Sequence, residues 1–372
     1  MSDRSIAIVA NSTWNIYNFR LNIIRKLRDE GFKVTVIAPL DEYIEYKEQF
    51  PGVRHIPVNN LERDNTNPFK DLALMFELRR IYKAINPDLV LHYTHKPNIF
   101  GGFAAGISGL PSIAVVTGLG YAFIRKGWLN NLTRLLYKLA GRFHKKIVFE
   151  NKEDLKYFLD KGLTNKSKVV SIKGCGVDTK NYFPVPNGIE KEKTIFTFIG
   201  RLLYDKGIVE FVEAAKLIRA KHPDTEFWVV GELDHGNPSM VEKEMLLDWI
   251  DRQYIIYHGF LRDVKPVIGK SDCIILPSFR EGMPRIILEA MSMAKPVITT
   301  RTAGCRETVT EGENGYLVNV ADIPDLVTAI ERFLKLEKAE RHKMGDYGRE
   351  MAVREFNSEK IAEALFEIIS LN

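Results

Sequence analysis

The 372-residue sequence has few cysteines, and they do not occur in the spacings that form paired or metal-bound sites. Cys175, Cys273 and Cys305 lie far apart, and there is no Cys-x-x-Cys pair. An odd number of widely separated thiols argues against a disulfide framework and against a structural zinc site. The sequence therefore favours a reducing compartment, and we expect a cytoplasmic protein.

The sequence also lacks a segment that is convincing as a signal peptide or a membrane span. The first apolar run, 5–10, is too short and follows an acidic residue too closely for a signal peptide. Residues 97–124 carry no charge, but six glycines and Pro111 interrupt them. This punctuation predicts a helix at about 98–108 and a buried strand at 112–116 in place of a bilayer span.

Three nucleotide-binding signatures are missing. The nearest approaches to Gly-x-Gly-x-x-Gly fail at Phe123 and at Thr179, and there is no Walker A sequence. No two aspartates stand one residue apart. These absences disfavour a dinucleotide dehydrogenase and a P-loop NTPase.

The composition is that of an ordinary globular protein, with 45% hydrophobic and 27% charged residues and a net charge of +5. Apolar strand-like runs alternate with helical stretches along the chain. The expected strands are 6–10, 34–38, 55–58, 89–93, 113–116, 147–149 and 169–172, then 194–200, 227–231, 255–258, 273–276 and 296–300. The main expected helices are 19–30, 68–85, 129–143 and 208–220.

Strands that are apolar throughout are typical of parallel sheets covered on both faces. We therefore expect an α/β protein with two doubly wound, Rossmann-like domains, 1–183 and 194–355, joined by a polar linker at 184–193. The segment 356–372 holds a helix with one apolar stripe, expected to pack toward the N-terminal domain. Such sheets bind ligands beyond the carboxyl ends of their strands, so we expect the domains to face each other across a substrate cleft.

In the second domain, two glutamates follow an expected strand. Glu281 precedes Gly282, Met283 and Pro284, and Glu289 lies in the helix that they open. Pro284 suits the first helical turn, and the preceding amides would form an anion site. Glu289 stands about 7.5 Å along the helix axis from Pro284, so the two carboxylates could hold separate hydroxyls of one ligand. The alternative is that Glu281 balances the helix dipole and Glu289 is a solvated surface residue.

Two cations occupy an equivalent place after the strand at 194–200. Arg201 leaves the end of the strand, and Lys206 precedes the helix at 208–220. A guanidinium together with an ammonium group suits a diphosphate. The alternative is a surface ion pair between Arg201 and Asp205, which would contribute little.

Together these motifs resemble the retaining GT-B glycosyltransferases of family 4, with further matches at 174–178, 259–261 and 304–307. The resemblance implies that Arg201 and Lys206 bind the donor diphosphate and that Glu281 contacts the donor sugar. It also implies that Glu289 holds the ribose and that the base lies beside Phe260 and Leu261. The loop at 282–284 would meet sugar and phosphate through the amides of Gly282 and Met283.

The first domain offers a histidine at an expected strand end. His95 follows the strand at 89–93, and the family often has a histidine here, near the donor sugar and the reacting centre. The resemblance therefore implies a catalytic role, the alternative being a structural histidine. His92 falls inside the strand, which predicts a core histidine.

Other first-domain residues resemble a subgroup that extends bacterial lipid-linked oligosaccharides, including N-acetylgalactosaminyl- and galactosyltransferases acting on undecaprenyl-diphospho sugars. The matching stretches are 15–20, 67–69, 95–101 and 118–120. The glycines that many members of the larger family have in the first loop are absent at 11–20. The candidate acceptor-binding residues are Asn15, Tyr17, Lys96, Asn98, Gly118 and Gly120.

A basic stretch runs from 123 to 146 and contains no acidic residue. Its cations are Arg125, Lys126, Arg134, Lys138, Arg142, Lys145 and Lys146, and Trp128 and several leucines are interleaved with them. One interpretation is an amphipathic helix on an anionic membrane surface, contacted by Arg125, Lys126 and Trp128. The other is a helix packed on its own sheet. Both hold if the leucines face the core while Trp128 and the cations face lipid.

The resulting hypothesis is a retaining hexosyltransferase bound peripherally at the inner face of the cytoplasmic membrane. It would move a GalNAc, Gal or GlcNAc type sugar from a UDP-type donor to a polyprenyl-diphosphate-linked sugar, with no metal or other cofactor. The alternatives are a GT-B sugar-nucleotide 2-epimerase and a non-catalytic sugar-nucleotide-binding module. No nucleic-acid-binding motif accompanies the basic stretch.

Overall fold

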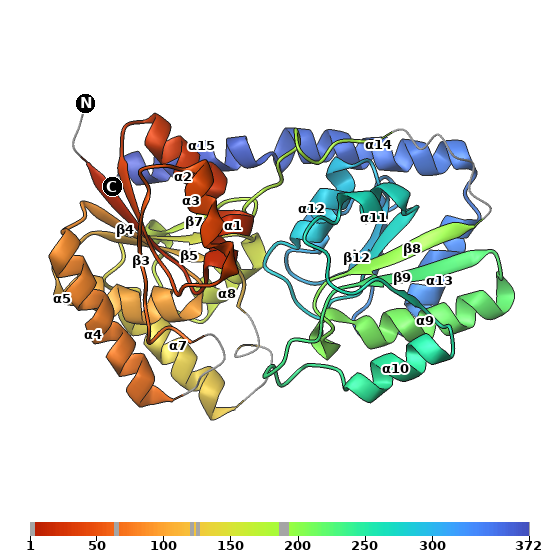
Figure 1. The fold of residues 1–372 in the computed structure, drawn as a ribbon, viewed down its shortest axis with the longest axis horizontal. Coiled ribbons are helices and arrows are strands. Elements are labelled where there is room, and N and C mark those ends of the chain that lie inside the picture. Colours follow the sequence, from red (N-terminus) through yellow and green to blue (C-terminus); the bar gives the residue numbers. More distant parts are fainter. Residues whose placement is uncertain (1–3, 63–66, 120–122, 124–126, 186–192, 372) are drawn as a thin grey trace. The chain divides into compact units, whose positions relative to one another are not determined.

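The computed structural model describes residues 4–371 except 63–66, 120–122, 124–126 and 186–192. Contacts divide the chain into two compact units (Figure 1). Unit 1 comprises Met1–Cys175 and Ser358–Asn372, and unit 2 comprises Gly176–Asn357.

Unit 1 is built on a parallel seven-stranded sheet in the order β3-β2-β1-β4-β5-β6-β7. The strands are β1 (Ser5–Val9), β2 (Lys33–Ile37), β3 (Arg54–Ile56), β4 (Leu89–Tyr93), β5 (Ser112–Val116), β6 (Lys146–Phe149) and β7 (Val169–Ser171). Every residue of β4 and of β5 is buried, as expected for central strands covered on both faces. The strand order reverses between β1 and β4, and open α/β sheets bind ligands at the carboxyl ends of the strands at such a point.

The helical segments of unit 1 depart from the sequence prediction at one informative place. They are α1 (Thr13–Phe19), α2 (Leu21–Asp29), η1 (Glu42–Glu45), α3 (Tyr46–Gln49), α4 (Pro68–Ile85), η2 (Pro97–Gly101), α5 (Gly102–Ile107), α7 (Trp128–Ala140), α8 (Lys152–Asp160), η3 (Lys166–Lys168) and α15 (Ser358–Ser370). The single helix expected at 19–30 is wrong, because α1 begins earlier and ends before Arg20. Arg20 separates α1 from α2 and is buried in an ion pair with Glu150.

Unit 2 is built on a parallel six-stranded sheet in the order β10-β9-β8-β11-β12-β13. The strands are β8 (Thr194–Ile199), β9 (Thr225–Val230), β10 (Ile256–Tyr257), β11 (Cys273–Leu276), β12 (Val297–Thr300) and β13 (Gly315–Val318). The sequence analysis did not predict β13, which is short and begins at a glycine. A Cβ on Gly315 would stand 1.8 Å from the Val297 carbonyl oxygen, so glycine is needed for this pairing.

The helices of unit 2 cover both faces of its sheet. They are η4 (Tyr204–Lys206), α9 (Ile208–Lys221), α10 (Lys243–Asp251), α11 (Lys265–Lys270), α12 (Arg285–Ser292), η5 (Arg306–Thr308), α13 (Ile323–Leu334) and α14 (Lys338–Glu355). One continuous core joins the strands to α9, α12 and α13, with Phe196, Phe211 and Phe333 fully buried within it.

The boundary between the units falls before the linker that the sequence predicted. Val177 donates its backbone N–H to the Phe356 carbonyl at 2.8 Å, and Arg349 donates to the carbonyl oxygens of Thr179 and Tyr182. These bonds hold the segment after Cys175 within unit 2, so a boundary at 183 is wrong. Residues 186–192 of the predicted linker lie outside the described residues. The helix α15 belongs to unit 1, where it packs on α2.

Candidate functional site

In unit 2 the two predicted cations and the predicted acid Glu281 follow adjacent strands. The strand β8 pairs with β9 on one side and with β11 on the other, so the order reverses at β8. Arg201 and Lys206 follow β8, and Glu281 follows β11. The topology therefore places these three side chains at the carboxyl edge where this class of sheet binds ligands.

The residues Lys206 and Glu281 are in direct contact. The Lys206 Nζ lies 2.5 Å from Glu281 Oε1, and both side chains are largely buried. The Ser278 hydroxyl lies 2.8 Å from the same carboxylate oxygen and 3.0 Å from the Asp205 carbonyl oxygen. The backbone N–H of Phe279 also donates to the Asp205 carbonyl, at 2.9 Å. The loop after β8 and the loop after β11 are thus tied together around one lysine–glutamate pair.

The residue Arg201 pairs with Asp234, which follows β9. Asp234 also accepts a hydrogen bond from the Asn237 side-chain amide at 2.9 Å. The alternative interpretation expected Asp205 as the partner of Arg201, and the structure has Asp234 in that place. Arg201 keeps about a third of its side chain exposed, at 36%.

The residue Glu289 is not the solvated helix residue that the alternative interpretation proposed. It is 6% exposed and accepts a hydrogen bond from Arg285 Nε at 2.7 Å. The pKa of Tyr182 is raised by burial and, further, by the nearby Glu289 carboxylate. Glu289 is therefore a buried, oriented carboxylate.

The loop at 281–284 differs slightly from the prediction and is tightly packed. Pro284 is the residue before α12, so its expected place in the first helical turn is off by one position. Met283 is buried in the core of the unit. Gly304 has a positive φ of 73°, and a Cβ there would stand 2.1 Å from the Gly282 carbonyl oxygen. A glycine at 304 therefore lets the neighbouring loop support Gly282.

The two residues predicted to lie beside a base follow the edge strand β10. Phe260 is 47% exposed, and Leu261 is half-buried against the core. Gly259 precedes them with a positive φ of 68°, and its carbonyl accepts a hydrogen bond from the Gly231 N–H at 2.9 Å. An exposed aromatic ring at this edge is available for stacking.

His95 occupies in unit 1 a place equivalent to that of Glu281 in unit 2. His95 follows β4, which pairs with the first strand β1, and Glu281 follows β11, which pairs with the first strand β8. Both pairings lie where the strand order reverses. Its Nδ1 lies 2.7 Å from the Tyr137 hydroxyl. The Phe123 ring stacks on the imidazole with centroids 6.1 Å apart, and burial lowers the pKa of His95 to about 4. His95 is therefore neutral near pH 7.

The core role predicted for His92 is confirmed. Its side chain is fully buried, and its Nε2 lies 2.9 Å from the Tyr82 hydroxyl. Burial holds the pKa of His92 well below its ordinary value.

The candidate acceptor residues that the structure describes are divided between buried and half-buried positions. Asn15 is buried and accepts a hydrogen bond from Arg20 Nε at 3.2 Å, and Asn98 is buried with its amide bonded to the Val115 carbonyl at 3.0 Å. Tyr17 is half-buried against Tyr43. The remaining candidates in the described part of unit 1 are Lys96, whose Nζ lies 2.8 Å from Asp71 Oδ1, and Gly118, which has a positive φ of 126° after β5. Gly120 lies outside the described residues.

The basic stretch includes α7, whose exposed side chains include three large apolar ones. Trp128, Leu132 and Leu135 are 76%, 41% and 52% exposed, whereas Tyr137 and Ala140 are buried. The expectation that the leucines face the core is therefore wrong for Leu132 and Leu135, because the helix turns its aromatic Tyr137 inward instead. Arg125 and Lys126 lie outside the described residues.

Sequence reasoning missed a second exposed apolar stripe, on α4. Phe69, Leu72 and Phe76 are 81%, 49% and 53% exposed and are spaced three and four residues apart, so they share one side of the helix. The opposite side of α4 carries the buried Leu74, Leu78 and Tyr82. The α4 and α7 helices both pack on η2. The helical spacing at 69–76 was the signal that could have revealed this stripe.

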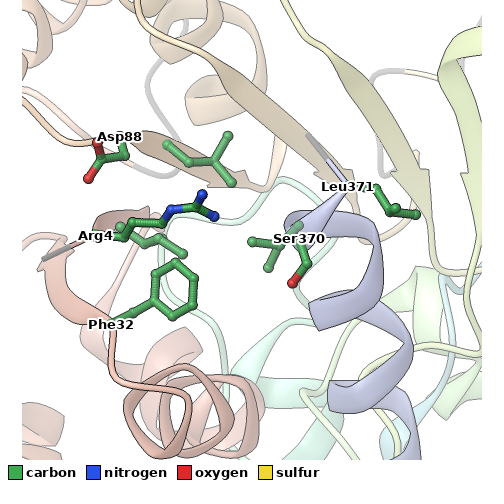
Figure 2. A pocket seen from close by; sticks show the side chains of 8 residues that line it. Arg4, Phe32, Asp88, Ser370 and Leu371 are labelled. Atoms are coloured by element: carbon green, nitrogen blue, oxygen red, sulfur yellow. The ribbon is translucent and has the colours of Figure 1, made fainter. Parts of the chain in front are cut away.

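A cavity of about 280 Å³ lies at the amino-terminal ends of the unit 1 strands, among Arg4, Phe32, Asp88, Ser370 and Leu371 (Figure 2). It surrounds the amino ends of β1 and β4. The Asp88 carboxylate there already accepts hydrogen bonds from the backbone and side chain of Ser5, and the backbone bond is the main reason that its pKa is lowered. This cavity is therefore remote from the strand ends that carry the candidate residues.

The described residues contain neither a group of metal ligands nor a membrane-spanning helix. No three His, Cys, Asp or Glu side chains in the described ranges are grouped as metal ligands. In the same ranges, no helix is long and apolar enough to cross a bilayer.

Comparison with known proteins identifies the family. Residues 180–351 match the family model "Glycosyl transferases group 1", and residues 5–151 match "Glycosyl transferase 4-like". The chain is 32% identical over 349 residues to the N,N'-diacetylbacillosaminyl-diphospho-undecaprenol alpha-1,3-N-acetylgalactosaminyltransferase of Campylobacter jejuni, covering 90% of each chain. The chain belongs to the group 1, family 4-like glycosyltransferases.

A second relative agrees with this assignment, and a solved structure has the same fold. The UDP-Gal:alpha-D-GlcNAc-diphosphoundecaprenol alpha-1,3-galactosyltransferase of Escherichia coli is 28% identical, covering 82% of this chain and 81% of its own. The sucrose-phosphate synthase of Thermosynechococcus elongatus superposes with a TM-score of 0.83 at 18% identity, covering 99% of this chain and 98% of its own. The expected GT-B fold is thereby confirmed for this glycosyltransferase.

Proposed function

We propose that this glycosyltransferase moves a hexose of the GalNAc, Gal or GlcNAc type from a UDP-sugar to a polyprenyl-diphosphate-linked sugar in bacterial glycan assembly. The names of both relatives support the acceptor class, and the name of the Escherichia coli relative, which specifies UDP-Gal, supports the donor class. The structural observation that supports the proposal is the contact between Lys206 and Glu281. Arg201, like Lys206, follows β8 and so lies at the same carboxyl edge of the sheet. Where a cation and an acid are in contact, the cation can bind a phosphate and the acid can bind a sugar hydroxyl of the same donor.

Arg201 and Lys206 bind the donor diphosphate in this proposal. Each is held by a carboxylate, Asp234 and Glu281 respectively, so each side chain is already desolvated in part and oriented. A diphosphate offers stronger, charge-assisted hydrogen bonds to both cations and would exchange with these carboxylates. The exchange would free Glu281 to accept a hydrogen bond from the donor sugar.

The rest of the donor is assigned to the neighbouring residues. The amides of Gly282 and Met283 precede α12, where the helix dipole favours an anion. Glu289 is buried and held by Arg285, which suits a carboxylate that accepts both hydroxyls of a ribose. Phe260 offers an exposed ring to the base.

The reaction proposed is transfer with retention of the anomeric configuration. The bond between the anomeric carbon and the donor phosphate oxygen breaks, and the acceptor hydroxyl oxygen bonds to the same face of the sugar. The proton of that hydroxyl passes to the leaving phosphate. Arg201, Lys206 and the amides before α12 stabilise the charge that develops on the phosphate, a role that needs no metal ion.

We also propose that α7 contacts an anionic membrane surface at the inner face of the cytoplasmic membrane. The exposed Trp128, Leu132 and Leu135 would enter the headgroup region, while Lys138 and Arg142, both exposed, would attract lipid phosphate. The exposed stripe on α4 would add apolar area on the same unit.

The test is a donor panel with the purified protein. UDP-GalNAc, UDP-Gal and UDP-GlcNAc are each incubated with short-chain polyprenyl-diphospho sugars, and the product linkage is determined by NMR. The proposal expects transfer from at least one donor to give an alpha-linked product. Conversion of a donor in the absence of acceptor would instead favour the epimerase. No transfer and no conversion with any pair, in protein that binds UDP, would favour the non-catalytic module.

A further inference from the structure

The helix α7 carries, besides its exposed apolar side chains, a buried tyrosine that contacts His95. Tyr137 is 4% exposed, and its hydroxyl lies 2.7 Å from His95 Nδ1. The two rings meet edge to face, with centroids 5.8 Å apart and an interplanar angle of 83°. Phe158 packs edge to face on the Tyr137 ring at 5.2 Å. Tyr137 is therefore fixed by packing and is bonded to one particular nitrogen of His95.

The role of such a bond follows from the protonation state of the histidine. His95 is neutral at pH 7, because burial lowers its pKa to about 4. A neutral imidazole carries one N–H, which can sit on either ring nitrogen, and the partner of one nitrogen decides the tautomer. Between a phenol and an imidazole, the phenol is the stronger acid and the imidazole nitrogen the stronger acceptor. The favoured arrangement has the tyrosine O–H donating to Nδ1, which leaves the hydrogen on Nε2.

We propose that Tyr137 is a positioning residue of this glycosyltransferase, one that holds His95 as the Nε2–H tautomer and fixes the plane of its ring. In that state His95 offers its Nε2–H as a hydrogen-bond donor for a substrate hydroxyl. Its Nε2 makes no hydrogen bond to any residue that the structure describes. The catalytic consequence of this inference rests on the proposed function, whereas the tautomer of His95 does not depend on it.

A matched control exists in the same unit. The Tyr46 hydroxyl lies 2.8 Å from His55 Nδ1, a bond of the same kind and nearly the same length. There, however, His55 Nε2 also has a partner, the Ala38 carbonyl oxygen at 3.0 Å. Because that carbonyl only accepts, it holds the hydrogen on Nε2 of His55 even without the tyrosine. A tyrosine-to-phenylalanine change should therefore alter the tautomer of His95 and leave that of His55 unchanged.

The experiment is a long-range ¹H–¹⁵N correlation spectrum of the histidine rings in the full-length protein at pH 7. Signals are assigned with His95→Gln and His55→Gln. The wild type is expected to show His95 as the Nε2–H tautomer. Tyr137→Phe should shift His95 to a mixture of tautomers, whereas Tyr46→Phe should leave His55 as the Nε2–H tautomer. An Nδ1–H tautomer in the wild type would overturn the proposal without any variant being needed, and so would an unchanged His95 signal in Tyr137→Phe.

Kinetics then separate this inference from the proposed function. Tyr137→Phe is expected to lower kcat about tenfold with little change in the donor KM, because a positioned hydrogen bond is lost while the diphosphate contacts stay. UDP affinity and thermal melting serve as folding checks. If the tautomer changes but no sugar transfer occurs with any donor, the proposed function fails and the positioning of His95 stands. If transfer occurs and Tyr137→Phe leaves both kcat and the tautomer unchanged, the positioning role fails alone.

Discussion

In unit 2 the candidate side chains that follow β8 and β11 are charged and held in ion pairs, whereas in unit 1 the candidate side chain that follows the equivalent strand β4 is a neutral histidine packed against aromatic rings. Lys206 contacts Glu281, and Arg201 contacts Asp234. His95 is surrounded by Phe123 and Tyr137, and its pKa is lowered to about 4. The same topology thus supports two different environments, one suited to a charged diphosphate and one suited to a neutral hydrogen-bond donor.

Under the proposed function, this difference indicates how the catalytic roles are divided between the two units. The charge that develops on a departing diphosphate needs nearby cations, and unit 2 supplies them already oriented by carboxylates. A neutral, rigid hydrogen-bond donor needs burial and a fixed tautomer, and in unit 1 aromatic packing and the Tyr137 hydroxyl surround His95 in the way that such a role requires. The predictions below test whether each environment does what its chemistry suggests.

The largest expected effect comes from removing the acid of unit 2. Glu281→Gln keeps the shape of the side chain but loses the charge that pairs with Lys206. Turnover should fall by roughly 1,000-fold, the range seen when one oriented group at a reacting centre is removed. The measurement is steady-state transfer, with UDP affinity as the folding control. A turnover within about threefold of the wild type would remove Glu281 from the mechanism.

The pH dependence of stability should differ between the units. Burial lowers the pKa of both His95 and His144 to about 4, whereas an unfolded histidine titrates near 6.5. Below pH 6.5 the unfolded chain therefore binds protons that the folded unit 1 does not, and stability is lost as the pH falls. At pH 5 each histidine should cost roughly 2 kcal/mol of unit 1 stability.

The measurement is urea unfolding at pH 7 and pH 5, followed by hydrogen exchange so that each unit is observed separately. In unit 2 burial also lowers the pKa of His258, so a smaller loss is expected there. Equal losses in the two units would contradict this interpretation of the histidine environments.

The buried ion pair of unit 1 should contribute strongly to its stability. Arg20 Nη1 lies 3.1 Å from Glu150 Oε1, each side chain is 5% exposed, and the guanidinium also covers the Tyr93 ring at 4.1 Å. Glu150→Ala should lower the free energy of unfolding by about 3 kcal/mol, because it leaves a buried, uncompensated guanidinium.

The matched control is Glu213→Ala, which breaks the more exposed pair with Lys216 on α9. We expect little change there, since exposed pairs are screened by solvent. Comparable losses in the two variants would mean that the burial of the Arg20 pair has no special effect.

The smallest expected effect concerns the membrane. Trp128→Ala should weaken binding to anionic vesicles by roughly tenfold, the loss expected when one large apolar side chain no longer enters the interface. Leu217→Ala, in α9 of unit 2, is a control with a 50% exposed apolar side chain. Co-sedimentation should also weaken with salt. Binding that ignores lipid charge, salt and Trp128 would exclude α7 as the contact.

Much of the fold could be predicted from local pattern. The expected strands 89–93 and 273–276 coincide with β4 and β11, and the expected helix 68–85 coincides with α4, because each is a run whose own composition determines its structure. The break at Arg20 could not be predicted, since it depends on Glu150, which is 130 positions away. For the same reason β13 was missed, because its pairing depends on the close approach of Gly315 to Val297.

The candidate site shows the same division. Local motifs selected Lys206 and Glu281, which the structure brings into contact. They did not select Asp234 or Tyr137, because neither has a distinctive neighbourhood in the sequence and each is defined by one long-range contact. Motifs therefore identified the groups proposed to bind the donor, and only the structure identified the groups that contact them.

The most direct test of the account is the affinity for UDP, measured by calorimetry on the wild type, Arg201→Ala, Lys206→Ala and the control Lys216→Ala. The account predicts that the first two variants bind UDP about 100-fold more weakly, since each loses a charge-assisted contact with the diphosphate, while Lys216→Ala binds as the wild type does. Wild-type affinity in both Arg201→Ala and Lys206→Ala would contradict the claim that this strand edge of unit 2 holds the donor diphosphate.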